Sequence, residues 1–438
     1  MEKRFLAAQK ALQPGGWNGS TGIIDSLRES GRSSFVSSGF PLLRDEQWRY
    51  TPVRKWLGDD FQFSQSADPG AVKLPSLIES TDAYIAVCVN GILQPALSRL
   101  PGPDQSVTIS TLSKALIEKP ELVSENLQRC NPGVDNTFFS LNLAFLNNGL
   151  FIHIPERTVL DKPLYITDIV TAPLPLFHQP RTLIVADSQA EATIVELRDR
   201  VENTSLFENT VTQIQLAAAS KVDYYHIYDR GSGARLVRTL NVYQERDTIF
   251  STNEISLSGS LIRSNLNFLP DGEGCETHLN GFYLAGSGTH VDVHTLVDHA
   301  KPNCVSNELF KGIIDDDGTA VFNGRVLVRQ DAQQTNAYQS NRNVLLSDKA
   351  HMYSKPELEI YADDVKCSHG ATTGKLDDEA LFYLRSRGIQ PSIARRMLLE
   401  AFASDVFSLI RIEELRVNVE ERVAALLDDG ISRDLTNG

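Results

Sequence analysis

Apolar and polar positions alternate along the middle of the chain, from about residue 150 to residue 375. A period of two is typical of strands that bury one face and expose the other. The clearest alternating runs are Thr193/Val195/Leu197, Val222/Tyr224/His226/Tyr228 and Val291/Val293/Thr295/Val297. Because no run of helical spacing interrupts this region, we expect it to consist of strands and turns.

Turn-forming residues recur through the same region at a nearly constant interval of 14 to 17 residues. They lie near Gly259, Glu273, Ser287, Pro302, Asp317, Asp331 and Asp348. Each interval accommodates a strand of about eight to ten residues, which is within the common range. A constant period of this length favours a β-solenoid over an antiparallel sandwich, whose strands follow one another roughly every 8–12 residues.

Two Asn-Gly pairs argue for the sandwich. Asn280-Gly281 and Asn323-Gly324 are typical of two-residue hairpin turns. The longer period still favours the solenoid, so we predict a mainly β protein with helical ends. Its parts would be an N-terminal helical and mixed region (1–150), a parallel β-helix core (151–375) and a C-terminal helical domain (376–438).

Three helices are predicted in the last part. The first begins at the acidic Asp377-Asp378-Glu379 and ends at Gly388, after two arginines. This charge order complements the helix macrodipole. Pro391 begins the second helix. The third helix carries the apolar residues Val419, Val423, Leu426 and Leu427.

In the N-terminal region we expect a strand at 84–89 and a helical stretch near 112–127.

The second C-terminal helix carries apolar residues at intervals of three and four positions. They form one continuous stripe of Ile393, Met397, Leu398, Phe402, Val406, Leu409 and Ile410. Such a stripe packs either against the solenoid and the neighbouring helices or against a partner protein. Under the second interpretation, the candidate partner-binding residues are Phe402, Val406 and Leu409.

The charge balance of the 438-residue chain limits its partners. The chain holds 42 basic and 56 acidic residues, a formal net charge of −14. This argues against nucleic acids and anionic membranes, because both bind clustered Lys and Arg. No run of 18 apolar residues is present to span a bilayer, and the N-terminus lacks the apolar segment of a signal peptide. We therefore expect a cytoplasmic protein.

Cysteine usage is typical of a reduced compartment. The five cysteines are Cys88, Cys130, Cys275, Cys304 and Cys367. Their number is odd, their spacings are wide and no Cys-x-x-Cys pair occurs. We therefore expect neither a disulfide framework nor a self-contained structural zinc site.

A thiol and an imidazole lie two residues apart in Cys367-Ser368-His369. In an extended segment both side chains share one face. A thiolate is a soft metal ligand and an acceptor of sulfur, and an imidazole can ligate iron. Two ligands cannot hold an iron–sulfur cluster, which takes four, so the others would come from another subunit or a carrier. The alternative is a half-buried Cys beside a surface His.

A second candidate cluster is formed by His290, Asp292 and His294, which share one face of a predicted strand. Two His and one Asp form a ligand set of metal enzymes, so a mononuclear metal protein is one hypothesis. The alternative is the polar outer face of a strand whose other face is core.

The chain has neither a Walker A motif nor Gly-x-Ser-x-Gly. Another hypothesis is a β-helix carbohydrate-active enzyme, which needs suitably spaced carboxylates.

Longer motifs resemble the SufD family along nearly the whole chain, most densely from about 290 to 390. The similar segments are Gly39-Phe-Pro, Arg44-Asp-Glu-Gln-Trp-Arg-Tyr-Thr51, Asp331-Ala332, Thr335, Asn341-Arg342-Asn343, Leu345-Leu346-Ser347, Lys355 to Thr372, and Phe382-Tyr-Leu-Arg-Ser-Arg-Gly388. SufB-like paralogues have more cysteines and tend to carry an acid where His369 stands. The Cys-Ser-His sequence therefore favours SufD over a SufB-like cluster scaffold.

The resemblance implies a right-handed parallel β-helix and a non-enzymatic scaffold role in iron–sulfur cluster assembly. It implies a complex with the paralogue SufB and the ABC-type ATPase SufC, which the C-terminal helices would contact. His369, with Cys367 beside it, matches the family's residues at the SufB–SufD junction, where a transient cluster would form. The resemblance links a reduced flavin to the complex and identifies no flavin-binding residue. An exposed sheet edge would also allow a homodimer of the isolated chain.

Overall fold

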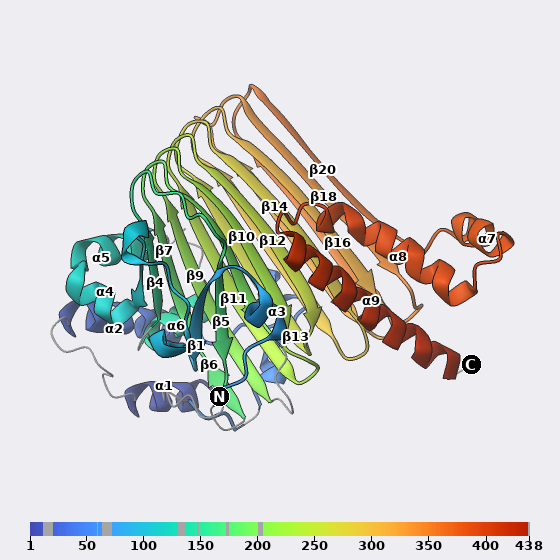
Figure 1. The fold of residues 1–438 in the computed structure, drawn as a ribbon, viewed down its shortest axis with the longest axis horizontal. Coiled ribbons are helices and arrows are strands. Elements are labelled where there is room, and N and C mark those ends of the chain that lie inside the picture. Colours follow the sequence, from blue (N-terminus) through green and yellow to red (C-terminus); the bar gives the residue numbers. More distant parts are fainter. Residues whose placement is uncertain are drawn as a thin grey trace.

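The chain folds as a parallel β-solenoid with helices at both ends (Figure 1). The computed structural model describes residues 1–11, 21–58, 60–63, 72–129, 136–146, 149–171, 175–199 and 205–436. Two ten-stranded sheets, here sheet A and sheet B, lie face to face, and from β8 onward consecutive strands alternate between them. The prediction of a mainly β solenoid with helical ends is confirmed.

All pairs along the body of each sheet are parallel, and antiparallel pairs occur only at β1–β2 and β3–β4. Sheet A contains β3 (Thr108–Thr111), β4 (Leu150–Ile154), β6 (Leu176–His178), β7 (Arg181–Ala186), β9 (Leu206–Leu216), β11 (Ala234–Gln244), β13 (Leu261–Pro270), β15 (His290–His299), β17 (Thr319–Val328) and β19 (His351–Ile360). Sheet B contains β1 (Tyr84–Val89), β2 (Ile92–Leu93), β5 (Leu164–Ile169), β8 (Glu191–Arg198), β10 (Lys221–Asp229), β12 (Ile249–Ser258), β14 (Glu276–Ala285), β16 (Val305–Ile314), β18 (Thr335–Leu345) and β20 (Val365–Gly374).

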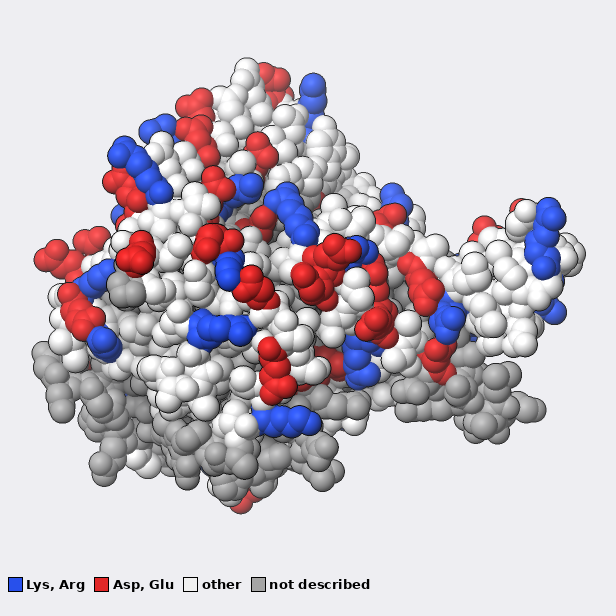
Figure 2. All heavy atoms as spheres, viewed as in Figure 1, with Lys and Arg blue, Asp and Glu red and all other residues white. Residues whose placement is uncertain are grey.

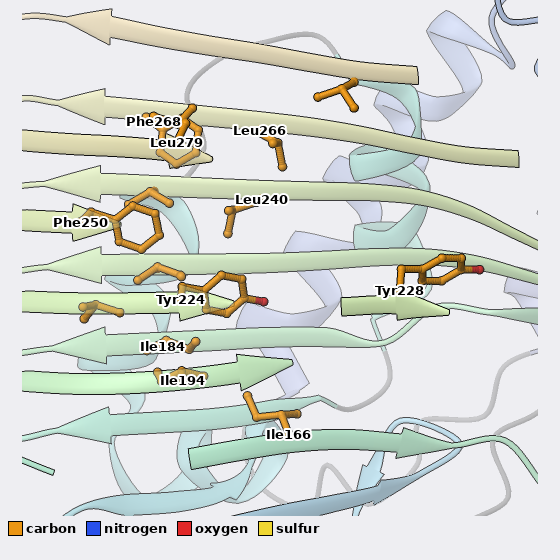
Figure 3. Close-up of a cluster of buried hydrophobic side chains, with 14 of the residues drawn as sticks. Ile166, Ile184, Ile194, Tyr224, Tyr228, Leu240, Phe250, Leu266, Phe268 and Leu279 are labelled. Carbon is orange, nitrogen blue, oxygen red and sulfur yellow. The ribbon is translucent and has the colours of Figure 1, made fainter. Parts of the chain in front are cut away.

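The main hydrophobic core lies between the two sheets. Alternate residues of each strand point inward and stack on the equivalent residues of the next turn, because neighbouring strands pair in register. Figure 3 shows part of this stack, with Ile194 and Tyr224 from sheet B near Ile184 and Leu240 from sheet A. All seven predicted turn positions lie between strands. The period of 14 to 17 residues therefore corresponds to one strand and its turn, or half a coil of the solenoid.

The hairpin interpretation of the two Asn-Gly pairs is wrong. Both pairs lie inside strands, one in β14 and one in β17. A Cβ atom on Gly281 would lie 2.1 Å from the ring of Phe310, and a Cβ on Gly324 would lie 2.0 Å from the amide of Gln339. These glycines therefore make room for large inward side chains on other strands, which is a recognised role of glycine within a strand.

Helices and short 3-10 turns cover the first part of the solenoid. They are α1 (Glu2–Ala11), α2 (Thr21–Ser38), η1 (Glu46–Trp48), η2 (Val53–Trp56), α3 (Ser76–Ser80), η3 (Pro95–Leu97), η4 (Pro103–Gln105), α4 (Leu112–Glu118), α5 (Pro120–Arg129) and α6 (Thr137–Ala144). The predicted strand at 84–89 is β1, and the helical stretch near 112–127 is divided between α4 and α5. Strands β1–β4 belong to the two sheets although they lie within or at the end of the region 1–150. The division at 150 and 375 stays a prediction.

Three C-terminal helices follow the last strand, as predicted. They are α7 (Asp378–Ser386), α8 (Pro391–Phe407) and α9 (Glu413–Thr436). Asp377 caps α7 by accepting hydrogen bonds from two backbone N–H groups, and Gly388 adopts a positive φ of 85° just after that helix. Helices α8 and α9 lie along the outer face of sheet B, and α7 projects away from the solenoid (Figure 1). Within the described ranges, no helix is both long and apolar enough to cross a membrane.

Candidate functional site at the open end of the solenoid

Cys367 and His369 lie on β20, the edge strand of sheet B. They pair in register with Ala337 and Gln339 of β18. Cys367 is half-buried and packs with Val365 against a small interior cluster, whereas His369 is exposed. Burial raises the pKa of the Cys367 thiol. The prediction that both side chains share one strand face agrees with this alternation.

The exposure of His369 follows from its position on the last turn. Gln339 occupies the same inward column one turn earlier and is only 4% exposed. No further coil covers the inward positions of β20 in the described part of the chain, so a residue that would be core elsewhere faces solvent. The site is therefore the uncovered interior of the solenoid rather than an outer surface.

The edge of sheet A differs from that of sheet B. Its edge strand β19 carries Pro356, which has no backbone N–H and is tolerated within a strand only at a sheet edge or bulge. Strand β20 contains no proline, and its last seven residues, 368–374, are all exposed. An edge strand with free donors and acceptors can pair with another chain, and β20 is the better suited of the two edges.

A polar column lies directly beneath His369 inside the solenoid. Gln339 Nε2 donates a 2.6 Å hydrogen bond to Oε2 of Glu308 on β16. Burial raises the pKa of Glu308 to about 7, against the opposing effects of the Gln339 hydrogen bond and the nearby Thr295 hydroxyl. Gly324 leaves the space that the Gln339 amide occupies. A carboxyl group that gains or loses a proton near neutral pH thus lies two strands from His369.

The orientation of the Gln339 side-chain amide determines which of its atoms is left for the His369 imidazole. Because Gln339 Nε2 is directed to Glu308, Gln339 Oε1 remains as an acceptor, and it is buried without a hydrogen-bond partner among the described residues. His369 is its in-register neighbour. A ligating histidine usually donates its second ring N–H to such an acceptor. Sequence reasoning missed Glu308 and Gln339. The only signal for them was Gly324, a glycine inside a predicted strand.

A second group of buried charges lies deeper in the solenoid. Arg198 of β8 bonds Asp168 at 3.0 Å and Glu196 at 2.8 Å, and it lies 3.6 Å from Glu208. Arg198 and Arg238 contribute to lowering the pKa of Glu196 despite complete burial. The alternation pattern alone did not predict these charges, because they occupy inward positions that otherwise hold apolar residues.

The side chains of His290, Asp292 and His294 are engaged by other side chains of the described structure. Asp292 is ion-paired with Arg263, bonds Thr51 and lies 3.1 Å from His294 Nε2, and Thr51 also bonds His290 at 2.8 Å. These contacts fasten the N-terminal segment onto the outer face of sheet A. Across the described ranges, no group of three or more His, Cys, Asp or Glu side chains is arranged to hold a metal ion.

Helix α8 ends at Phe407, so Leu409 and Ile410 of the predicted stripe lie beyond it, and the rest of the stripe is divided between two faces. Val406 is fully buried against sheet B, and Phe402 is partly buried with Lys311 Nζ 4.6 Å from its ring centre. Val406 is therefore part of the fold and cannot be a contact for a partner in this structure. Leu409 and Met397 are 41% and 42% exposed, so they remain available.

A groove of about 560 Å³ lies between α8 and α9. It is lined by Met397, Glu400, Ala401, Ser404, Phe407, Glu420, Glu421, Val423 and Ala424. Its floor is apolar and it carries three carboxylates. Over the described residues on the face drawn in Figure 2, acidic and basic side chains are interspersed. The groove is an apolar surface with three carboxylates, two of which lie near arginines of the same helices: Glu400 is 3.5 Å from Arg396 and Glu420 is 3.2 Å from Arg416.

Comparisons with known proteins agree with this architecture. A family model described as "SUF system FeS cluster assembly, SufBD core domain" matches residues 170–402, and one described as "SufBD protein N-terminal region" matches residues 10–166. The chain is 30% identical over 413 residues to an iron–sulfur cluster assembly SufBD family protein of Synechocystis sp., covering 92% of this chain and 91% of the relative. It is 30% identical over 401 residues to the iron–sulfur cluster assembly protein SufD of Escherichia coli, covering 90% of this chain and 91% of the relative.

Proposed function

The chain belongs to the SufBD family of iron–sulfur cluster assembly proteins, and from this premise we propose that it is a non-enzymatic scaffold subunit that shares a nascent-cluster site with a SufB-like paralogue. The observation that carries the proposal is the pair of side chains on β20. Cys367 and His369 lie on an uncovered edge strand, one half-buried and one exposed. They supply two of the four ligands that a cluster takes.

The chemistry of the two side chains suits a shared, transient site. The cluster is cargo that passes through the site. His369 is exposed and can approach iron from the solenoid end, whereas the raised pKa of Cys367 keeps its thiol protonated until iron or a base of the partner removes the proton. In the proposed site, Gln339 Oε1, which has no partner among the described residues, would accept the second imidazole N–H and fix the ring orientation. The paralogue supplies the remaining ligands.

The C-terminal helices are the proposed contact for a SufC-like ABC ATPase. The support is the acidic, apolar groove between α8 and α9 together with the exposed side chains Met397 and Leu409. A complementary partner surface would present basic and apolar side chains.

A reduced flavin belongs to the proposal only as a component of the complex. A homodimer of the isolated chain would use the same β20 edge and would compete with the paralogue.

Amide hydrogen exchange tests both contacts. In the chain alone we expect fast exchange in the outward-facing amides of β20 and at the exposed ends of α8. In a complex with the paralogue, the β20 amides should become protected, because a new strand or loop accepts their hydrogen bonds. Addition of the ATPase should slow exchange in α8 and α9 without further change in β20. Unchanged exchange in β20 upon complex formation would disprove pairing at this edge.

A further inference from the structure

Two buried thiols lie on top of each other in consecutive coils of sheet B. Cys275 precedes Glu276 and Cys304 precedes Val305, and Glu276 and Val305 are partners in the β14–β16 register. The backbone N–H of Val305 donates to the carbonyl oxygen of Cys275 at 2.8 Å, so the ladder includes the cysteines. Neighbouring strands are about 4.8 Å apart, which falls within the Cα separation of roughly 4.4–6.8 Å that a disulfide spans.

The two sulfur atoms lie close to the same backbone carbonyl oxygen. Cys275 Sγ lies 3.2 Å and Cys304 Sγ lies 3.3 Å from the carbonyl oxygen of Gly272. The neighbouring Cys304 thiol is the largest cause that lowers the pKa of Cys275 to about 7, and burial opposes it. The Thr248 hydroxyl donates to the same sulfur at 3.5 Å. One thiol is thus disposed to ionise while its neighbour keeps its proton.

We propose that Cys275 and Cys304 are an oxidation site, at which the two stacked thiols form a reversible disulfide between consecutive coils. The two residues that flank the pair in this stacked column both carry hydroxyl groups, Thr248 on one side and Thr335 on the other. The turns next to the pair reach solvent, since Glu273 and Asn303, which lie two residues and one residue before the two cysteines, are exposed and bond each other at 2.7 Å. A small oxidant therefore has a short way to reach sulfur.

The oxidant is a peroxide such as hydrogen peroxide. The Cys275 thiolate attacks one peroxide oxygen and the O–O bond breaks, which gives a sulfenic acid and, with the thiol's proton, one water. The Cys304 sulfur then attacks the Cys275 sulfur, the S–O bond breaks, and a second water leaves with the Cys304 proton. Two thiols and one peroxide become one disulfide and two waters. A dithiol reductant reverses the change by thiol–disulfide exchange.

The disulfide would cross-link neighbouring coils of the solenoid without displacing them. It closes a chain segment of β14, β15 and their turns, so it restricts the unfolded state. The oxidised chain should therefore unfold at a higher urea concentration than the reduced chain. The pair lies in the same sheet as β20, and Cys304 neighbours Thr335, which neighbours Val365. Oxidation would thus stiffen the coils that support the open end.

The test uses the full chain treated with hydrogen peroxide, alkylated, and cut at the acidic residues between the two cysteines, such as Asp292 and Asp298. We expect a linked pair of peptides that carries Cys275 and Cys304, weighs two hydrogens less than the separate peptides, and disappears after dithiothreitol. In Cys304→Ser the link should be lost, and a sulfenic acid at Cys275 should become trappable by dimedone. Recovery of both peptides unlinked and unoxidised from the wild-type chain would overturn the proposal, and so would linkage of either cysteine to Cys367 instead.

A second measurement does not depend on any variant. The urea midpoint of the wild-type chain is compared before and after peroxide treatment, and again after reduction. A midpoint that rises on oxidation and returns on reduction supports a native disulfide between coils. A linked pair that forms only when peroxide is added to the urea-unfolded chain would contradict the proposal, because the folded geometry would then play no part.

Discussion

Replacing Arg198 by Met should lower the free energy of unfolding by at least about 3 kcal/mol. The guanidinium is 4% exposed and neutralises three buried carboxylates, Asp168, Glu196 and Glu208. Removing one partner of a buried ion pair leaves an uncompensated charge in a medium of low dielectric constant, which costs about 3–5 kcal/mol. Other cations remain nearby, including Arg230, which lies 3.2 Å from Glu208, so part of the network survives.

Urea unfolding at pH 7.5, followed by circular dichroism, measures this effect. The control is Arg157→Met, because the Arg157 side chain is 75% exposed in its pair with Glu156 and exposed ion pairs contribute little. We expect a large shift of the midpoint for Arg198→Met and almost none for the control. Equal midpoints for the two variants would mean that the interior charges do not stabilise the solenoid.

Replacing Glu308 by Gln should stabilise the protein at pH 8 by up to about 3 kcal/mol. The folded-state pKa of Glu308 is raised from 4.5 to about 7, and each unit corresponds to about 1.4 kcal/mol. Because the folded chain holds the Glu308 proton more tightly than the unfolded chain, the contribution of this group to stability is greatest below pH 4.5 and is lost as the pH rises through 7. Gln is neutral at every pH and can still accept the hydrogen bond from Gln339.

The measurement is the unfolding free energy of both chains at several pH values between 4.5 and 8. The advantage of Glu308→Gln should grow with pH across this range and vanish near its lower limit. Glu125→Gln, at an exposed position of α5, should show no such trend. A constant difference between Glu308→Gln and the wild type would show that the carboxyl does not change its charge in this range.

Periodicity carried most of the fold prediction. In-register coils need turns at a constant spacing, so the positions from Gly259 to Asp348 identified the solenoid before any contact was known. The helix signals at Asp377, Gly388 and Pro391 were equally local and marked α7 and α8 to within a residue or two. These features follow from neighbouring residues alone, which is why they could be predicted.

The sequence patterns that allowed more than one interpretation depend on contacts between distant segments. Gly281 resembled a turn residue because the ring of Phe310, which needs its space, lies on another strand. Asp292 resembled a metal ligand because Arg263 and Thr51, its partners, are remote in sequence. The α8 stripe looked continuous because periodicity does not distinguish the face that covers sheet B from the face left exposed.

The candidate site was predicted only in part. Alternation placed Cys367 and His369 on one face, and the chemistry of a two-ligand set indicated a shared site. The supporting column of Gln339 and Glu308 depends on the register between β16, β18 and β20, which a single sequence does not show. Register thus places Gln339 and Glu308 in line with His369.

Iron content of the coexpressed complex tests the central claim most directly. The chain is produced with its SufB-like and SufC-like partners as wild type, as His369→Ala and as His351→Ala, which alters an exposed imidazole on β19. We expect all three complexes to form with the same composition. Iron and sulfide per complex should fall close to background in His369→Ala and stay at the wild-type level in His351→Ala. A full complement of cluster in the intact His369→Ala complex would contradict the account.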